Sequence, residues 1–237
     1  MNSEYGEAGV LYLVGTPIGN LGDMTYRAVE VLAQVDLIAA EDTRRTAILL
    51  KHYSITTPTT SFFDFNKEKK TPHLIEKLLG GASIAIVSDA GTPGISDPAF
   101  FLVRAALVAG VKVEAIPGPT AVIAALIVSG LPTDRFVFEG FLPAKKGRQK
   151  RLDALVTEQR TIILYESPQR APRTLRDLLK TLGERNVVIA RELTKKFEQI
   201  IRGNLSEVLE RIELQPLKGE IVIVLEGYTR AMKKLLY

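Results

Sequence analysis

The stretch from Ser83 to Pro98, SIAIVSDAGTPGISDP, has the composition of a ligand-binding loop that follows a buried strand. Its first part is apolar and β-branched, and its second part consists of small and turn-forming residues. Gly91 and Gly94 allow backbone to approach a ligand closely, and Pro93 limits how far the loop can move. In a parallel α/β sheet such a loop lies at the carboxyl edge, where ligands bind. By itself, the loop fits a tight strand-to-helix connection equally well.

A second set of candidate groups is charged and follows apolar runs in the second half of the chain. Arg191–Glu198, RELTKKFE, crowds glutamate and lysine at one strand end, and Tyr165–Arg170, YESPQR, follows another strand. A glutamate and a lysine this close perturb each other's pKa, which is typical of a site that handles protons. A solvated charged turn has the same composition and is the more common structure for an unaided charge run.

A third candidate is a basic run that lacks acidic residues. It consists of Lys145, Lys146, Arg148, Lys150 and Arg151. Arg170 opens a second basic stripe, with Arg173 and Arg176 at intervals of three residues. Basic clusters of this kind can bind phosphates, although an isolated cluster is more often a solvated face.

Strands that alternate with helices must position these groups. In the first half, apolar strands are predicted at 10–14, 37–40, 84–87 and 111–116, and in the second half at 136–139, 161–165, 187–190 and 221–225. Helical periodicity lies between most of them. The alternation predicts an α/β protein with mostly parallel sheets, in two domains that span residues 1–118 and 119–237. We expect a ligand cleft between the two domains.

Composition narrows the class of protein. The 237 residues are 46% hydrophobic and 24% charged, which is ordinary for a globular protein. The absence of cysteine excludes disulfides and thiolate metal sites, and two histidines argue against a histidine metal site, so no metal is expected. The opening residues lack a signal-peptide pattern, and no apolar run reaches about 18 residues. We therefore expect a cytoplasmic protein without membrane contact, whose net charge of +4 allows a polyanionic partner.

Six motifs, in matching order, resemble the ribosomal RNA small-subunit methyltransferase I family of the tetrapyrrole (corrin/porphyrin) methylase superfamily. They are GTPIGNLGD (15–23), AEDTRRT (40–46), SDAGTPGISDPA (88–99), PGPTA (117–121), YESPQR (165–170) and RELTKKFE (191–198). The resemblance covers residues 10 to 227. It implies two α/β domains, S-adenosylmethionine bound in the cleft between them, and a homodimer. It also implies methylation of the ribose 2′-hydroxyl of one cytidine in the decoding region of 16S rRNA, as naked rRNA or within the small ribosomal subunit.

The resemblance also implies which residues contact the methyl donor. They are Pro17, Asp89, Ala90, Gly91, Thr92, Ile95, Thr120, Ala121, Tyr165, Glu166, Gly219 and Glu220. Backbone groups around Gly91 suit the amino-acid part of the donor, while Ile95 and Ala121 suit the adenine or the methylene chain. Many members of the family carry a further C-terminal segment, so we expect RNA binding that differs from theirs.

The implied reaction is an in-line displacement in which the 2′-oxygen attacks the methyl carbon and the thioether leaves. Lys195 is the leading candidate to deprotonate or polarise the hydroxyl, with Glu192 and Glu198 holding it in place. Two other functions remain open at this point. One is a tetrapyrrole or other small-molecule methyltransferase on the same fold. The other is a non-catalytic RNA-binding or ribosome-assembly protein, for which the intact SDAGTPGISDP loop would have no evident use.

Overall fold

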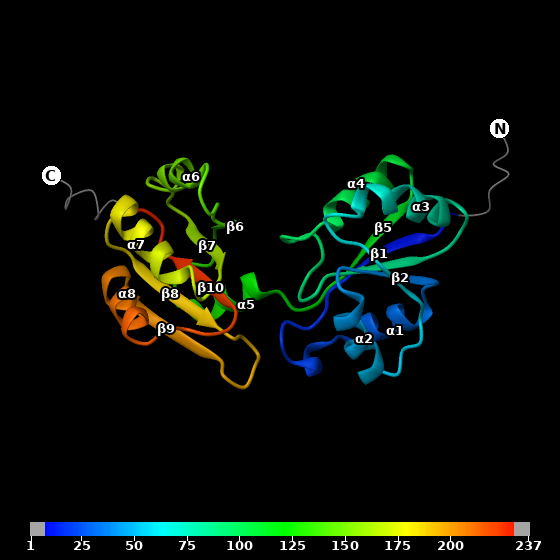
Figure 1. Ribbon diagram of the computed structural model, residues 1–237, viewed down its shortest axis with the longest axis horizontal. Coiled ribbons are helices and arrows are strands. Elements are labelled where there is room, and N and C mark those ends of the chain that lie inside the picture. The colour runs from blue at the N-terminus through cyan, green and yellow to red at the C-terminus, as the bar shows by residue number, and fades with distance from the viewer. Residues whose placement is uncertain (1–7, 230–237) are drawn as a thin grey trace. The chain divides into compact units, whose positions relative to one another are not determined.

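A computed structural model describes residues 8–229, and the chain forms two compact units that divide between Thr120 and Ala121 (Figure 1). Unit 1 precedes this point and unit 2 follows it. Each unit has its own five-stranded sheet and its own buried apolar core. Among residues 8–229, no helix combines the length and the apolar character that crossing a membrane requires.

Unit 1 contains a parallel sheet, as the sequence predicts. Its elements are β1 (Val10–Val14), the 3-10 helix η1 (Leu21–Asp23), α1 (Tyr26–Gln34), β2 (Leu37–Ala40), α2 (Thr43–His52), β3 (Thr59–Ser61), α3 (Lys67–Leu79), β4 (Ile84–Val87), α4 (Ala99–Val108) and β5 (Lys112–Ile116). The strand order is β3-β2-β4-β1-β5, and each neighbouring pair is parallel.

Alternation along the strands of unit 1 explains why both faces of its sheet are covered. Leu11 and Ile86 pack with α3 and α4, whereas Val14 and Val87 pack with α1 and α2. Successive strand residues point to opposite faces, so a strand buried on both sides must be apolar throughout. Figure 1 shows α3 and α4 on one side of this sheet and α1 and α2 on the other.

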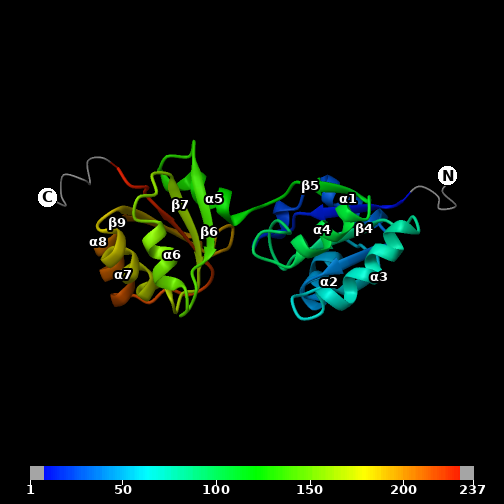
Figure 2. The same ribbon diagram turned by 90° about the horizontal axis from the view of Figure 1, so that it is seen from above.

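Unit 2 has a mixed sheet. Its elements are α5 (Ala121–Ser129), β6 (Phe136–Phe141), α6 (Arg148–Ala154), β7 (Thr161–Glu166), α7 (Ala171–Leu182), β8 (Asn186–Arg191), β9 (Gln199–Asn204), α8 (Leu205–Leu214) and β10 (Ile221–Leu225). Helices α6, α7 and α8 contribute to the core on one face, and α5 contacts β8, β9 and β10. Figure 2 shows α5 on the opposite side of the sheet from α6 and α7.

The expectation of a mostly parallel sheet is wrong for unit 2. The strand order is β6-β7-β10-β8-β9, in which β6 pairs with β7 in parallel while β7–β10, β10–β8 and β8–β9 are antiparallel. The reason is local for β8 and β9, because residues 192–198 are too short for a parallel crossover, which needs a dozen or more residues. The chain therefore folds back on itself, and the charged segment 192–198 becomes the turn of a hairpin.

Two loops of unit 1 touch through glycine. A Cβ atom built on Gly118 would lie 2.9 Å from the Cα of Gly15, and one on Gly15 would lie 2.8 Å from the Cα of Gly118. Real Cβ contacts to backbone are not this short, so neither position has room for a side chain. The absence of side chains at these two positions therefore lets the loop after β1 and the loop after β5 pack closely against each other.

We predict that Gly118→Ala lowers the free energy of unfolding by about 1–3 kcal/mol, because the added methyl group must push the two loops apart. The measurement is urea denaturation followed by circular dichroism. Gly80→Ala is the matched control, because its Cβ would meet backbone at an ordinary 3.4 Å. Equal stability of the two variants would contradict the close approach.

Candidate functional site

The loops at the carboxyl edge of the unit 1 sheet form one connected surface. The amide of Thr16 donates to the carbonyl of Gly91 at 2.9 Å, and the amide of Gly91 donates to the carbonyl of Thr16 at 3.0 Å. The hydroxyl of Thr92 donates to the carbonyl of Pro119 at 3.2 Å. These bonds connect the loops after β1, β4 and β5, which follow adjacent strands.

The loop after β4 is closed by its own acidic residue. Gly91 and Gly94 have φ of +81° and +92°, a region that glycine adopts without strain. The carboxylate of Asp97 accepts the amide of Gly94 at 2.8 Å and that of Ala99, the first residue of α4, at 2.8 Å. The loop is thereby fixed to the helix that follows it.

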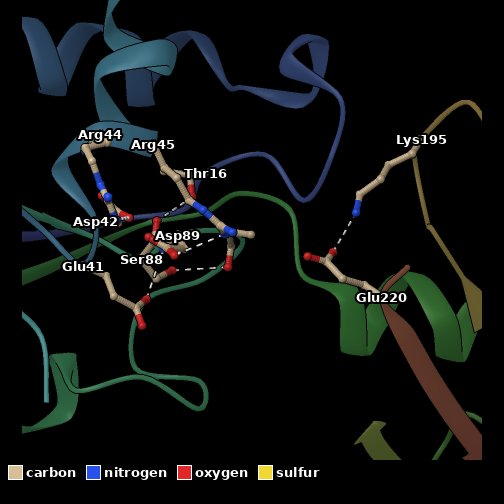
Figure 3. A network of polar contacts seen from close by, with 10 residues as sticks. Thr16, Glu41, Asp42, Arg44, Arg45, Ser88, Asp89, Lys195 and Glu220 are labelled. Atoms are coloured by element: carbon tan, nitrogen blue, oxygen red, sulfur yellow. Dashed lines mark hydrogen bonds and ion pairs between the residues drawn. The ribbon is translucent and has the colours of Figure 1, made fainter. Parts of the chain in front are cut away.

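A polar cluster lies beside this loop (Figure 3). The carboxylate of Glu41 accepts the amide of Asp89 at 3.2 Å, and Arg45 lies 3.2 Å from Oδ2 of Asp89. Oδ1 of Asp89 is buried and has no hydrogen-bond partner among residues 8–229. Burial raises the pKa of Glu41, opposed by the hydrogen bond from the Asp89 amide and reinforced by the charge of Asp89. A buried carboxylate oxygen without a donor fits a ligand that brings an N–H or O–H group.

The other unit 1 residues implied to contact the donor lie on these same loops. Gly91 is buried, Pro17, Thr92 and Thr120 are half-buried, and Ala90 is exposed. Ile95 has 43% of its surface exposed, which leaves an apolar side chain available to a ligand. Ala121 begins α5 and belongs to unit 2.

The loop after β2 also carries a tight ion pair. Asp42 caps α2 by accepting the amide of Arg44 at 2.9 Å, and its two oxygens accept the Arg44 guanidinium at 3.0 and 2.7 Å. The hydrogen bonds from Arg44 lower the pKa of Asp42 to about 2. Asp42 is therefore a permanent anion that orients Arg44.

In unit 2, Lys195 lies between two carboxylates. Its Nζ is 2.8 Å from Oε1 of Glu192 and 2.9 Å from Oε2 of Glu220, and Figure 3 shows the contact with Glu220. Oε1 of Glu192 also accepts the amide of Glu220 at 2.9 Å. Gly219 makes room for this arrangement, because a Cβ there would lie 2.3 Å from the Glu192 carboxyl carbon.

Glu198 does not hold Lys195, which corrects the expectation from the sequence. Its carboxylate instead accepts the amide of Thr194 at 2.6 Å, within the turn between β8 and β9. Glu220 takes the place expected for Glu198. The antiparallel pairing of β10 with β8, which puts Ile221 opposite Arg191, brings Glu220 to this position.

The ionisation of this cluster favours one of the two roles expected of Lys195. Partial burial lowers the pKa of Lys195, but the hydrogen bonds to Glu192 and Glu220 outweigh it and raise the pKa overall. The hydrogen bond from Lys195 correspondingly lowers the pKa of Glu192. Lys195 is therefore an ammonium group at neutral pH. It can polarise a hydroxyl by donating to it, and it has no free electron pair with which to remove a proton.

Glu166 and Arg148 belong to a buried network, which corrects two of the expected roles. Nη2 of Arg148 donates to the hydroxyl of Thr174 at 2.8 Å, and this hydroxyl donates to Oε2 of Glu166 at 2.6 Å. Nε of Arg148 also donates to Asp177 at 2.8 Å. Arg148 has 5% of its surface exposed and Glu166 has 3%. These side chains connect α6, β7 and α7, and Arg148, Thr174 and Glu166 are buried.

The remaining residues of the basic patch are exposed, but some are paired. Lys145, Lys146 and Lys150 are exposed. Arg151 forms an ion pair with Glu139, and Arg170 pairs with Glu166 at 3.2 Å and donates to the carbonyl of Leu142. Of the five basic residues predicted to form a phosphate-binding surface, three lysines and the paired Arg151 are therefore exposed, and Arg148 is buried.

Tyr165 lies beside two phenylalanine rings. Its ring centroid is 4.9 Å from that of Phe138 and 5.6 Å from that of Phe141. Burial raises the pKa of its hydroxyl, which stays protonated at neutral pH. Among residues 8–229, no group of three or more His, Cys, Asp or Glu side chains gathers in a way that could hold a metal ion.

The sequence indicates that the loop beginning at Glu41 meets the loops at Gly15 and Ser88 at one edge of a parallel sheet, but it does not single out Thr16, Glu41 or Arg45 as individual residues. The signal for Glu41 was present, since Glu41 directly follows an apolar strand in the same way as the loop at Ser88, whereas Arg45 lies within α2. Thr16 is buried, and its part in the site lies in its backbone bridge to Gly91. No local pattern reveals that bridge, because the two residues come from different loops.

Comparison with known proteins adds independent findings. The family model of the tetrapyrrole (corrin/porphyrin) methylases matches residues 10–209. The chain is 57% identical over 223 residues to the ribosomal RNA small subunit methyltransferase I of Synechocystis sp., covering 93% of this chain and 80% of that protein. It is 48% identical over 219 residues to the protein of the same name from Thermotoga maritima, covering 92% and 99%.

The fold has also been seen in solved structures. Uroporphyrin-III C-methyltransferase from Thermus thermophilus, in complex with S-adenyl homocysteine, aligns with a TM-score of 0.64 at 20% identity, covering 91% of this chain and 97% of that one. At this identity the likeness shows the fold alone. Together with the family model and the relatives, it leads to one conclusion: the chain belongs to the tetrapyrrole (corrin/porphyrin) methylase family and, within it, to the ribosomal RNA small subunit methyltransferase I group.

Proposed function

We propose that this chain transfers a methyl group from S-adenosylmethionine to small-subunit ribosomal RNA. The observation that carries the proposal is the 57% identity, over 93% of the chain, to a protein named ribosomal RNA small subunit methyltransferase I. The finer target, the ribose 2′-hydroxyl of a cytidine in the decoding region, rests on the motif resemblance. A homodimer and a cytoplasmic location are part of the same proposal.

The donor site that we propose is built on the loops after β1, β4 and β5. The unpartnered Oδ1 of Asp89 supports this assignment, because it offers a buried acceptor to an amino or hydroxyl group of the donor. The backbone of Gly91, the side chain of Ile95 and residues Pro17, Ala90, Thr92, Thr120 and Ala121 complete the site. The motif resemblance alone supports Tyr165, Gly219 and Glu220 as donor contacts in this proposal. Glu166 is not part of the proposed donor site, because the Ser167 amide and the Thr174 hydroxyl already donate to its two oxygens.

S-adenosylmethionine, when bound, supplies an electrophilic methyl group and a neutral thioether leaving group. The protein's main task is then to align the acceptor oxygen with that methyl group. Alignment of two reactants can contribute roughly 7–11 kcal/mol, whereas a general acid or base typically contributes about 10²–10⁴-fold in rate. The ordered loop backbone at Gly91 and Asp97 suits such a task.

Lys195 acts on the acceptor in this proposal. Its ammonium group, held by Glu192 and Glu220, donates a hydrogen bond to the ribose 2′-oxygen and thereby lowers the pKa of the hydroxyl. The hydroxyl proton passes to solvent water as the bond from the 2′-oxygen to the methyl carbon forms and the bond from that carbon to sulfur breaks. The two glutamates keep the ammonium protonated and limit its motion. Glu198 contributes indirectly, by ordering the turn that carries Lys195.

The function is tested by incubating the protein with radiolabelled S-adenosylmethionine and three acceptors. These are small ribosomal subunits that lack the modification, deproteinised 16S rRNA and a uroporphyrinogen-type tetrapyrrole. We expect label in a ribose of the RNA. Label in the tetrapyrrole would select the small-molecule methyltransferase instead, and no label in any acceptor, with RNA binding intact, would select a binding protein.

For the donor site, we predict that Asp89→Asn weakens S-adenosylmethionine binding about tenfold or more, because a hydrogen bond to a charged acceptor contributes about 1.5–3 kcal/mol. Isothermal titration calorimetry provides the measurement. Asp134→Asn is the control, since Asp134 is exposed and pairs only at 3.7 Å with Arg135. Unchanged affinity in Asp89→Asn would remove this residue from the site.

For the acceptor, we predict that Lys195→Met lowers kcat by about 10²–10⁴-fold at saturating donor and RNA and leaves donor affinity unchanged. Lys195→Arg should recover part of the rate, because it restores a donor that is always charged. Glu192→Gln should shift any alkaline loss of activity to lower pH, since removing a negative neighbour lowers the pKa of Lys195. Lys196→Met is the control, and normal turnover in Lys195→Met would rule out the role.

A further inference from the structure

Unit 1 exposes aromatic rings beside its loops. Phe65 has 96% of its surface exposed, Phe63 has 37% and Phe101 has 39%. The rings of Phe63 and Phe65 meet edge to face, with centroids 6.4 Å apart. A single exposed phenylalanine is ordinary, but two exposed rings in contact form an apolar surface of the kind that can meet a partner.

The backbone that carries these rings is fixed. Phe62 is buried, and its amide donates to the carbonyl of Ala40 at 2.7 Å. The side chain of Asn66 accepts the amide of Phe63 at 2.8 Å and donates to the carbonyl of Ser61 at 3.2 Å. The loop therefore presents the two rings from an ordered platform, which lowers the entropy lost when a partner binds.

Lys67 contacts both the loop that carries these two phenylalanines and the ring of Phe101. Nζ of Lys67 lies 2.8 Å from Asp64, between Phe63 and Phe65 in sequence, and 5.9 Å from the ring centroid of Phe101. Lys67 is the first residue of α3 and Phe101 lies in the first turn of α4. We name these four residues, Phe63, Phe65, Lys67 and Phe101, the aromatic edge.

The aromatic edge belongs to the same edge of the sheet as the loop at Asp89. β3 pairs in parallel with β2, and β2 with β4, so the segments after all three strands start at one edge. The segment after β2 adds Arg44, whose side chain is 89% exposed, and Arg45. Exposed rings and cations on the same edge are a combination that proteins use to bind single-stranded nucleic acid, because every base has a π-face and each nucleotide carries a phosphate.

We propose that the aromatic edge stacks unpaired bases of the ribosomal RNA, with Phe65 as the principal platform. This inference rests on the proposed function and assigns the RNA a binding surface on unit 1, in addition to the lysines of unit 2. A single-stranded segment is required, since the faces of paired bases are covered by their neighbours.

The test measures binding of deproteinised 16S rRNA and of unmethylated small subunits to Phe65→Ala, Phe65→Leu and Phe65→Trp. We expect about 5- to 150-fold weaker RNA binding for Ala, the range given by one lost stacked base. Phe65→Leu should bind RNA as weakly as Phe65→Ala, and the RNA affinity of Phe65→Trp should stay within about threefold of that of the native protein. The dependence of affinity on salt should keep its slope, because no phosphate contact is lost.

Leu107→Ala is the matched control, since Leu107 is an exposed apolar residue of α4 at 62% exposure. Thermal melting and donor affinity should be unchanged in every variant. RNA affinity that is retained in both Phe65→Ala and Phe65→Leu would overturn the proposal. Full RNA affinity in Phe65→Leu together with a changed oligomeric state would also overturn it, because that result would indicate contact with a second copy of the chain.

Failure of the aromatic edge and failure of the proposed function give different results in the RNA-binding and methylation measurements. If the native protein methylates RNA and Phe65→Ala binds RNA normally, the function stands and the aromatic edge falls. If RNA binding weakens in Phe65→Ala while the native protein methylates nothing, the surface stands and the reaction falls. If the native protein neither binds nor methylates RNA, both are overturned.

Discussion

The parallel pairing of the unit 1 strands is the constraint on which the candidate site depends. In a parallel sheet, a helix must return the chain after each strand, so each strand ends at the same edge. Thr16, Glu41 and Asp89 follow three different strands and meet there for that reason alone. Residues that are far apart in the sequence therefore lie close together in space, although no single segment of the sequence indicates that they are neighbours.

Much of unit 1 could be predicted because its signals are local. The apolar run before Ser88, the glycines that follow it and the N-cap at Asp42 each specify their own structure. The mixed sheet of unit 2 could not be predicted in this way, since an apolar strand such as β10 does not reveal the direction of its neighbours. The contact between Lys195 and Glu220 depends on that pairing, and it was missed for the same reason.

The charges of unit 2 illustrate a second limit. Arg148 and Lys150 are neighbours in a basic run, yet one is buried and the other is exposed. Burying a guanidinium is unfavourable unless its donors are satisfied, and Thr174 and Asp177 on the adjacent α7 satisfy them. Composition reports the charge but not the partner, and the partner decides whether a basic residue faces solvent.

The unpartnered oxygen of Asp89 has a consequence for the lifetime of the protein. A buried acceptor without a donor disfavours the folded loop, and any small molecule that donates to it favours folding by mass action. Each tenfold excess of such a molecule over its dissociation constant adds roughly 1.4 kcal/mol to the stability of unit 1. With the methyl donor bound to this oxygen as proposed, resistance to proteolysis would follow the cellular supply of the donor.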